Sequence, residues 1–181
     1  NLLKKLGVRD FDMLTAASSI IRPGVADSGM MKTFIDRHNG KEPVTYLHPK
    51  METTLKDTFG VMIYQEDVIK VAHIIARMSL NEADSLRKCM SKKRNRKNIN
   101  TCRQRFISGA IANKVKTRTA LGIWRQIESF AGYAFCKAHS ASFAMVSYRA
   151  AYLKAHYPAE FMAAVLSNRG GFYDAAAYIE E

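Results

Sequence analysis

The segment from Leu86 to Phe106 concentrates positive charge in a way that could bind a polyanion. It carries nine Lys or Arg side chains and no Asp or Glu. Guanidinium and ammonium groups presented together suit a triphosphate or a nucleic-acid backbone. Arg87 and Lys88 fall in the last part of an expected helix, and Asp84 lies three and four residues earlier, where it can hold either side chain in position. The segment therefore predicts a phosphate-binding surface.

The excess positive charge of the whole chain is confined to this region. The net charge is +12; residues 85–127 hold thirteen Lys or Arg and no acid, whereas the remainder holds fifteen basic and sixteen acidic residues. A block of one sign repels itself, and it usually persists because a polyanion offsets the repulsion. Two alternatives stay open here: a solvated, flexible basic loop, and a surface that docks an acidic partner protein.

A second candidate phosphate site lies at residues 137–142, in the sequence KAHSAS. These residues open an expected helix, whose first N–H groups have no partner within the helix. Lys137, His139, Ser140 and Ser142 would gather an ammonium group, an imidazole and two hydroxyls at that end. A helix N-terminus equipped in this way attracts phosphate. For His139 alone, a histidine satisfied inside the core is the alternative.

Carboxylates do not form a recognisable catalytic set. Two-metal nucleotidyl transfer needs carboxylates that converge, whereas Asp10 and Asp12 precede an apolar helical run, so one of them is expected to cap that helix. Three scattered cysteines and five histidines show no zinc-ligand spacing. The chain also contains no Walker-type, GxSxG or HExxH motif. We therefore assign neither a metal site nor a catalytic residue to it.

Hydrophobic periodicity predicts an all-α, mainly helical fold with at most a short β element near residues 60–64. One helix is expected to begin near Gln65, and Ser79 with Glu82 forms a capping box for the next. Tyr64 and Gln65 then stand at the junction between the β-like run and the helix. A buried tyrosine beside a helix-opening glutamine is the structural alternative to a binding role for this pair.

The stretch from residue 140 to 157, SASFAMVSYRAAYLKAHY, is apolar on nearly every side of a helix. In a soluble protein such a helix belongs at the centre of a core, so we expect it to be buried. Phe106 and Trp124 lie close to the basic segment, but a stripe at helical spacing is more often core than a base-stacking platform.

Length and composition indicate a globular chain without a membrane span. The 181 residues suffice for one domain, or for one domain and a small appendage. No apolar run has the length of a transmembrane helix, and no signal-peptide pattern opens the chain, whose first residue is Asn1. We expect a piece of a longer, cytoplasmic polypeptide whose few cysteines stay reduced.

Five blocks of the sequence, in order and at suitable spacing, resemble the fingers region of bacterial C-family replicative DNA polymerases of the alpha-subunit type. They are RPG at 22–24, HP…LKDTFGVMIYQEDV at 48–68, NEADSLRKCMSKK at 81–93, FAGYAFCKAHSASFAMVSYRAAYLKAHYPAEFMAAVLSN at 130–168 and GGFY at 170–173. The likeness covers essentially the whole chain, and the two longest blocks are highly specific. It implies an irregular multi-helix fingers domain over residues 1–169, with residues 170–181 opening the connection to a following domain.

The resemblance implies that the chain holds the triphosphate of an incoming nucleotide and contacts template–primer DNA. It places seven residues at the nucleotide: Tyr64, Gln65, Arg87, Lys88, Lys137, His139 and Ser140. The expected DNA contacts come from a basic row, in which the first two members also match the family: Lys92, Lys93, Arg94, Arg96, Lys97, Arg103 and Arg105. Three departures from the family pattern should tune affinity, namely Lys88 for a common arginine, Ser91 for a glycine, and Cys136 with Ala138 for polar residues.

The resemblance further implies a DNA-directed DNA polymerase as the parent protein. Its two Mg²⁺ ions would be held by palm aspartates upstream of this segment, so we expect the chain alone to be inactive. The implied partners are template–primer DNA, dNTP substrates, the parent's other domains and, through regions outside this chain, replisome subunits such as the sliding clamp; no membrane is implied. The alternative is a stand-alone basic helical module that binds nucleic acid without catalysis and needs no triphosphate pocket.

Overall fold

The computed structural model describes residues 2–21, 29–91, 96–131, 135–169 and 176–177, with the backbone alone at residues 91, 96, 97 and 131. Within these ranges the chain is helical almost throughout, and its β structure is an isolated parallel bridge between Tyr64 and Phe135. The expected all-α class, with a short β element near residues 60–64, is confirmed. No helix among the described residues is long and apolar enough to cross a membrane.

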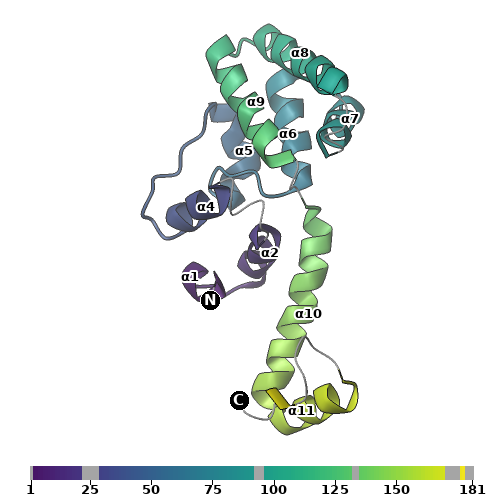
Figure 1. The fold of residues 1–181 in the computed structure, drawn as a ribbon. Helices are drawn as coiled ribbons and strands as arrows, with labels where there is room; N and C mark the ends of the chain where they lie inside the picture. The colour runs from purple at the N-terminus through teal and green to yellow at the C-terminus, as the bar shows by residue number, and fades with distance from the viewer. Residues whose placement is uncertain (1, 22–28, 92–95, 132–134, 170–175, 178–181) are drawn as a thin grey trace. The chain divides into compact units, whose positions relative to one another are not determined.

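The helices differ in length, and a ten-residue loop, residues 39–48, separates α4 from the next element (Figure 1). In chain order they are α1 (Leu2–Leu6), α2 (Phe11–Ile20), α4 (Met30–His38), α5 (Glu52–Leu55, between 3₁₀ turns at Pro49–Met51 and Lys56–Thr58), α6 (Gln65–Ala76), α7 (Leu80–Ser91), α8 (Arg96–Ala112), α9 (Thr117–Ala131), α10 (Lys137–His156) and α11 (Pro158–Ser167). They fall into two compact units, residues 1–141 and residues 142–181.

The main core of the first unit forms around α6, which packs against α7, α8 and α9 (Figure 1). Val68, Val71 and Ile75 recur at helical spacing on α6 and are completely buried. From α8 and α9, the rings of Phe106 and Trp124 meet with their centroids 5.8 Å apart. Both aromatic residues are therefore core residues, as their spacing predicted.

Two contacts fix α8 against the end of α6. The Asn113 side-chain amide donates to the carbonyl oxygens of Ile74 and Ile75, at 3.0 Å each. At Gly109 a β-carbon would collide with the carbonyl oxygen of Ala76, so only glycine allows this close approach of the two helices. The helix that carries much of the basic segment is thus held on the core.

A smaller cluster joins α1, α2 and α4 to the segment before α6. Leu6, Ile20 and Phe34 are completely buried there, together with Ile63. At the start of α2, the Asp10 carboxylate accepts a hydrogen bond from the Met13 N–H at 2.7 Å. The expected capping role of Asp10 is confirmed.

The prediction that residues 140–157 form a central core helix is wrong in one respect. A helix does form, and it begins three residues earlier than expected, at Lys137. Of its described residues, however, only Ser140 and Ala144 are buried, whereas Val146 and Tyr148 are 65% and 57% exposed. A helix buries apolar side chains only where another surface covers them, and within the described part of residues 142–181 the accompanying helix is the ten-residue α11.

Candidate functional site

Helix α7 presents Arg87 and Lys88 because its opposite side is anchored. The Ser79 N–H donates to the Glu82 carboxylate at 2.7 Å, and the Glu82 N–H donates to the Ser79 hydroxyl at 3.2 Å, which confirms the predicted capping box. The apolar stripe Ala83, Leu86 and Met90 is buried against the core. The side chains between these positions therefore point outward.

Asp84 holds both cations, as its spacing predicted. One carboxylate oxygen lies 2.8 Å from Nη2 of Arg87, and the other lies 2.7 Å from Nζ of Lys88. Hydrogen bonds from Lys88 and then Arg87 lower the pKa of the Asp84 carboxyl below its ordinary value. Asp84 thus stays ionised and limits the positions that the two long side chains sample.

Arg87 also reaches across to α6. Its Nη1 donates to the side-chain oxygen of Gln65 at 3.0 Å. Gln65 is the first residue of α6, and the turn before it is fixed by Asp67, whose carboxylate accepts the N–H groups of Ile63 and Tyr64 at 3.0 and 2.9 Å. Burial raises the pKa of Asp67 to about 6, although these two N–H donors act in the opposite direction.

The same turn contacts the segment that opens α10. The Gln65 N–H donates to the carbonyl oxygen of Phe135 at 2.9 Å, beside the Tyr64–Phe135 bridge. The Glu66 carboxylate accepts the Lys137 N–H at 3.1 Å, and the Lys137 ammonium lies 5.4 Å from the centroid of the Tyr64 ring. Residues 65 and 135, seventy positions apart in sequence, are therefore neighbours.

The first turn of α10 differs from its prediction in two ways. The Lys137 N–H is not unpaired, because it donates to Glu66, so the expected set of empty N–H groups is wrong at that position. Ser140 is completely buried, and its hydroxyl lies 2.6 Å from the hydroxyl of Ser19 on α2. His139, by contrast, is exposed, with its ring edge-on to Phe135 at 4.8 Å between centroids.

Tyr64 lies beneath this turn rather than on the surface. It is 4% exposed, and its side chain hydrogen-bonds to Ser19, which links it to Ser140. Burial, followed by the nearby charge of Asp67, raises the pKa of the Tyr64 hydroxyl. Tyr64 and Ser140 therefore support the junction from inside, while the side chains of Arg87, Lys88 and Lys137 stand around it.

The expected DNA-contacting residues fall into four groups. Lys92, Lys93 and Arg94 lie outside the described residues, and for Arg96 and Lys97 the structure gives only their place in the first turn of α8. Arg103 is exposed on α8. Arg105 points toward α7, where its Nε donates to Glu82 at 2.9 Å and lowers the pKa of that carboxyl to about 2.

Sequence reasoning missed three members of the site: Ser19, Glu66 and Asp67. Glu66 and Asp67 looked like surface charges in the first turn of a helix. The partner of Glu66, Lys137, lies 71 positions away and no local spacing indicates it. Asp67, however, closes a capping box with Tyr64, which the three-residue spacing could have indicated. Ser19 belongs to α2, and its contact with Ser140 joins positions 121 residues apart. No local pattern could have found it.

The acidic side chains of the described residues do not cluster around one point. No group of three or more His, Cys, Asp or Glu side chains converges among them. Mg²⁺ prefers several oxygen ligands around one point, whereas Asp84 and Glu66 are engaged with cations or an N–H donor. The cations that these contacts position are Arg87, Lys88 and Lys137.

The structure describes an all-α chain that carries cations on α7 and at the start of α10. The family model described as "Bacterial DNA polymerase III alpha subunit finger domain" matches residues 1–114. The chain therefore belongs to the finger-domain family of bacterial DNA polymerase III alpha subunits, which confirms the resemblance noted in the sequence.

Curated relatives support this assignment over most of the chain. DNA polymerase III subunit alpha of Aquifex aeolicus (strain VF5) is 43% identical over 92% of this chain, and that of Escherichia coli (strain K12) is 41% identical over 92%. An error-prone DNA polymerase of Symbiobacterium thermophilum is 42% identical over 90%. The aligned part corresponds to 14–15% of the length of these relatives.

Proposed function

We propose that this chain holds the triphosphate of an incoming dNTP for a DNA polymerase and guides template–primer DNA along its basic segment. The observation that supports this most strongly is the hydrogen bond between Arg87 and Gln65. Because Gln65 also donates to Phe135, it joins the cation of α7 to the segment that opens α10. A ligand with several phosphates could then contact Arg87, Lys88 and Lys137 together.

Carboxylates keep these cations in place before the nucleotide arrives. Asp84 holds Arg87 and Lys88, and Glu66 occupies the Lys137 N–H where an anion would otherwise sit. Groups positioned in advance lose little freedom on binding and need little reorganisation during phosphoryl transfer. In this proposal the triphosphate takes the place of Glu66 at Lys137, and His139 faces the sugar.

The remaining assignments follow from the same arrangement. Tyr64 and Ser140 act as buried supports, Gln65 orients Arg87, and Arg103 and Arg105 with the basic residues before them contact DNA. The parent enzyme would carry out template-directed DNA synthesis with Mg²⁺ bound by residues outside this chain. Template–primer DNA, dNTPs, the parent's other domains and, further away, replisome subunits such as the sliding clamp are the proposed partners.

Calorimetric titration of the 181-residue chain with dATP tests the triphosphate site. Arg87→Gln should weaken binding about tenfold or more, because hydrogen bonds to charged groups contribute roughly 1.5–3 kcal/mol. Arg149→Gln removes the same charge from an exposed position on α10 and should leave binding unchanged. Equal affinities for the wild type and both variants would contradict the proposal, and DNA binding without any dATP binding would favour the stand-alone module.

A further inference from the structure

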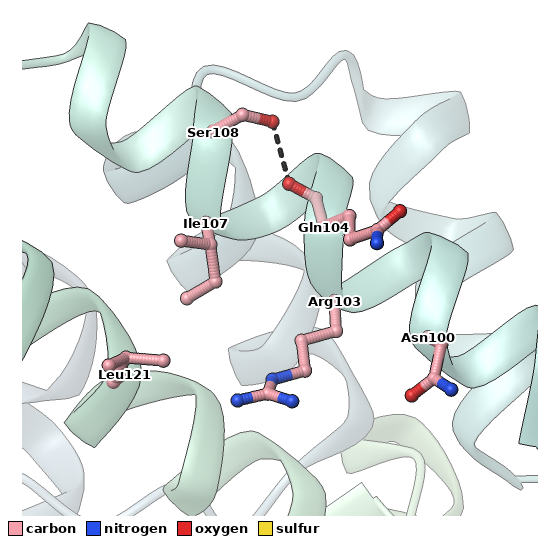
Figure 2. Close-up of a pocket in the computed structure, with 6 residues that line it drawn as sticks. All are labelled: Asn100, Arg103, Gln104, Ile107, Ser108 and Leu121. Atoms are coloured by element: carbon pink, nitrogen blue, oxygen red, sulfur yellow. Dashed lines mark hydrogen bonds between the residues drawn. The ribbon is translucent and has the colours of Figure 1, made fainter.

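A groove lies between α8 and α9, away from the residues assigned to the triphosphate. Its volume is about 630 Å³, within the range of roughly 300–1,000 Å³ typical of small-molecule sites. It is lined by Asn100, Arg103, Gln104, Ile107 and Ser108 from α8 and by Leu121 from α9 (Figure 2). The α8 residues recur at intervals of three and four positions, so they share one face of the helix.

This groove combines an apolar wall with polar groups of three kinds. Ile107 and Leu121 are half-buried and supply the wall. The side-chain amides of Asn100 and Gln104 are exposed and can both donate and accept hydrogen bonds. Figure 2 shows the Arg103 side chain extending from α8 into the space between Leu121 and Asn100.

The charge around the groove is positive. On α9, Arg118 precedes Leu121 by three residues and Arg125 follows it by four, so both share its face of the helix, and both are exposed. No Asp or Glu occurs between residues 85 and 127, and the first acid along α9 is Glu128, two turns beyond Leu121. An anionic ligand is therefore favoured over a neutral or cationic one.

We propose that this groove binds one unpaired nucleotide of single-stranded DNA. The base lies against Ile107 and Leu121, its polar edge meets the amides of Asn100 and Gln104, and its phosphate meets Arg103. Unstacked bases are commonly recognised by stacking on aromatic rings together with hydrogen bonds to the base edge, and here the aliphatic side chains of Ile107 and Leu121 take the place of the ring. The inference rests on the proposed function, since that function brings DNA to α8.

Two other polyanions fit the groove less well. Duplex DNA keeps its bases stacked, so it would use Arg103, Arg118 and Arg125 but neither the apolar wall nor the amides. An acidic peptide would likewise use the cations and leave the flat wall empty. The distinguishing property of the proposed ligand is an exposed base, and the experiment depends on it.

Fluorescence anisotropy can compare two labelled twelve-nucleotide strands, oligo(dT) and a strand of the same length with abasic sites throughout. The wild-type chain should bind oligo(dT) about fivefold more tightly, because a net hydrogen bond to the base edge contributes roughly 0.5–1.5 kcal/mol. Leu121→Ala and Gln104→Ala should each reduce that preference, with affinity for the abasic strand unchanged. Leu80→Ala, at a residue 61% exposed on α7, is the matched control and should change neither affinity.

Leu121 is half-buried, so Leu121→Ala could disturb the packing of α9. Gln104 is exposed, and its replacement by alanine therefore tests the groove without that effect. Arg103→Gln should weaken the binding of both strands by the same factor, because it removes a contact with a phosphate that both strands contain. The inference would be overturned if the wild type bound oligo(dT) and the abasic strand with equal affinity. It would also be overturned if Leu121→Ala and Gln104→Ala preferred oligo(dT) as strongly as Leu80→Ala does.

Failure of the inference can be separated from failure of the proposed function. Salt-dependent binding of duplex DNA without any preference for bases would overturn the groove proposal alone. If neither duplex nor single strands bound, the proposed DNA-guiding function would fail with it. Displacement of oligo(dT) by poly-glutamate at equal charge concentration, with no base preference, would also overturn the inference and favour an acidic protein partner.

Discussion

Helices α6 and α10 are both rich in apolar residues, but their environments differ completely. Val71 and Ile75 of α6 are fully buried, whereas Val146 and Leu153 of α10 are 65% and 46% exposed. On α6 the apolar residues share one side, and the helix packs against α5, α7, α8 and α9, while on α10 the apolar residues surround the helix. Apolar composition therefore indicates that a helix can be buried, and the arrangement of its neighbours decides whether it is.

The two parts of α10 also differ in their contacts and exposure. Its first turn is tied to the first unit through Ser140, which is buried beside Ser19, and through the Lys137 N–H. Beyond residue 141 the exposed apolar side chains include Tyr148 and Tyr152. The anchored part of α10 is therefore its first turn.

Matched leucine truncations should give the largest effect. Leu55→Ala, at a fully buried position in the main core, should lower the free energy of unfolding by about 2–5 kcal/mol, because a cavity is left behind. Leu153→Ala on α10 should change it by less than about 0.5 kcal/mol. Urea denaturation of the two variants measures the difference, and equal losses of stability would show that the contrast between the core around α6 and the exposed part of α10 is wrong.

The stability of the chain should depend on pH through Asp67, which fixes the turn before α6. The pKa of Asp67 is raised in the folded chain, so its protonated form favours folding; this stability is fully present below about pH 4 and is lost as the pH rises through about 6. A shift of this size corresponds to about 3 kcal/mol at most. Unfolding of the wild type and of Asp67→Asn should therefore be compared from pH 4.5 to 7.

The wild type should lose stability relative to Asp67→Asn as the pH rises across this interval. Subtracting the variant removes the contribution of other groups, including the histidines. A constant difference between the two proteins over the whole interval would contradict the raised pKa and, with it, the burial of this carboxylate.

A smaller effect is expected from the serine pair that anchors α10. Ser19→Ala leaves the buried Ser140 and Tyr64 hydroxyls without a common partner, which should cost about 1–2 kcal/mol of stability. Ser147→Ala, on the exposed part of α10, should cost almost nothing. Thermal unfolding of both variants measures this, and equal midpoints would mean that the first turn of α10 is no better anchored than the rest.

Local sequence patterns predicted the parts of the fold that depend on neighbours in the chain. The capping residues Asp10, Ser79 and Glu82 formed as expected, because each bonds within three residues. Helix α8 was missed, because Arg and Asn side chains interrupt a buried stripe that includes Phe106 and Ala110. With these charged and polar residues between them, the apolar residues of the segment did not show a recognisable helical periodicity.

The candidate site depended on tertiary contacts that no local pattern contains. The Arg87–Gln65 and Lys137–Glu66 contacts join residues 22 and 71 positions apart. Charge and spacing singled out Arg87 and Lys137, and the family resemblance, which records such contacts indirectly, placed them with Gln65 at one ligand. Their approach to one another required the packing of α7 on α6 and the pairing of Gln65 with Phe135.

Nitrogen-15 NMR of the 181-residue chain during titration with dATP tests the central proposal most directly. The side-chain Nε of Arg87 and the backbone amide of Lys137 should shift together with one apparent Kd, since a single triphosphate would contact both and displace Glu66. The amide of Arg149 should not move. If the Arg87 and Lys137 signals shifted with clearly different affinities, the account would be contradicted. It would also be contradicted if dATP shifted other signals to saturation and left those of Arg87 and Lys137 unchanged.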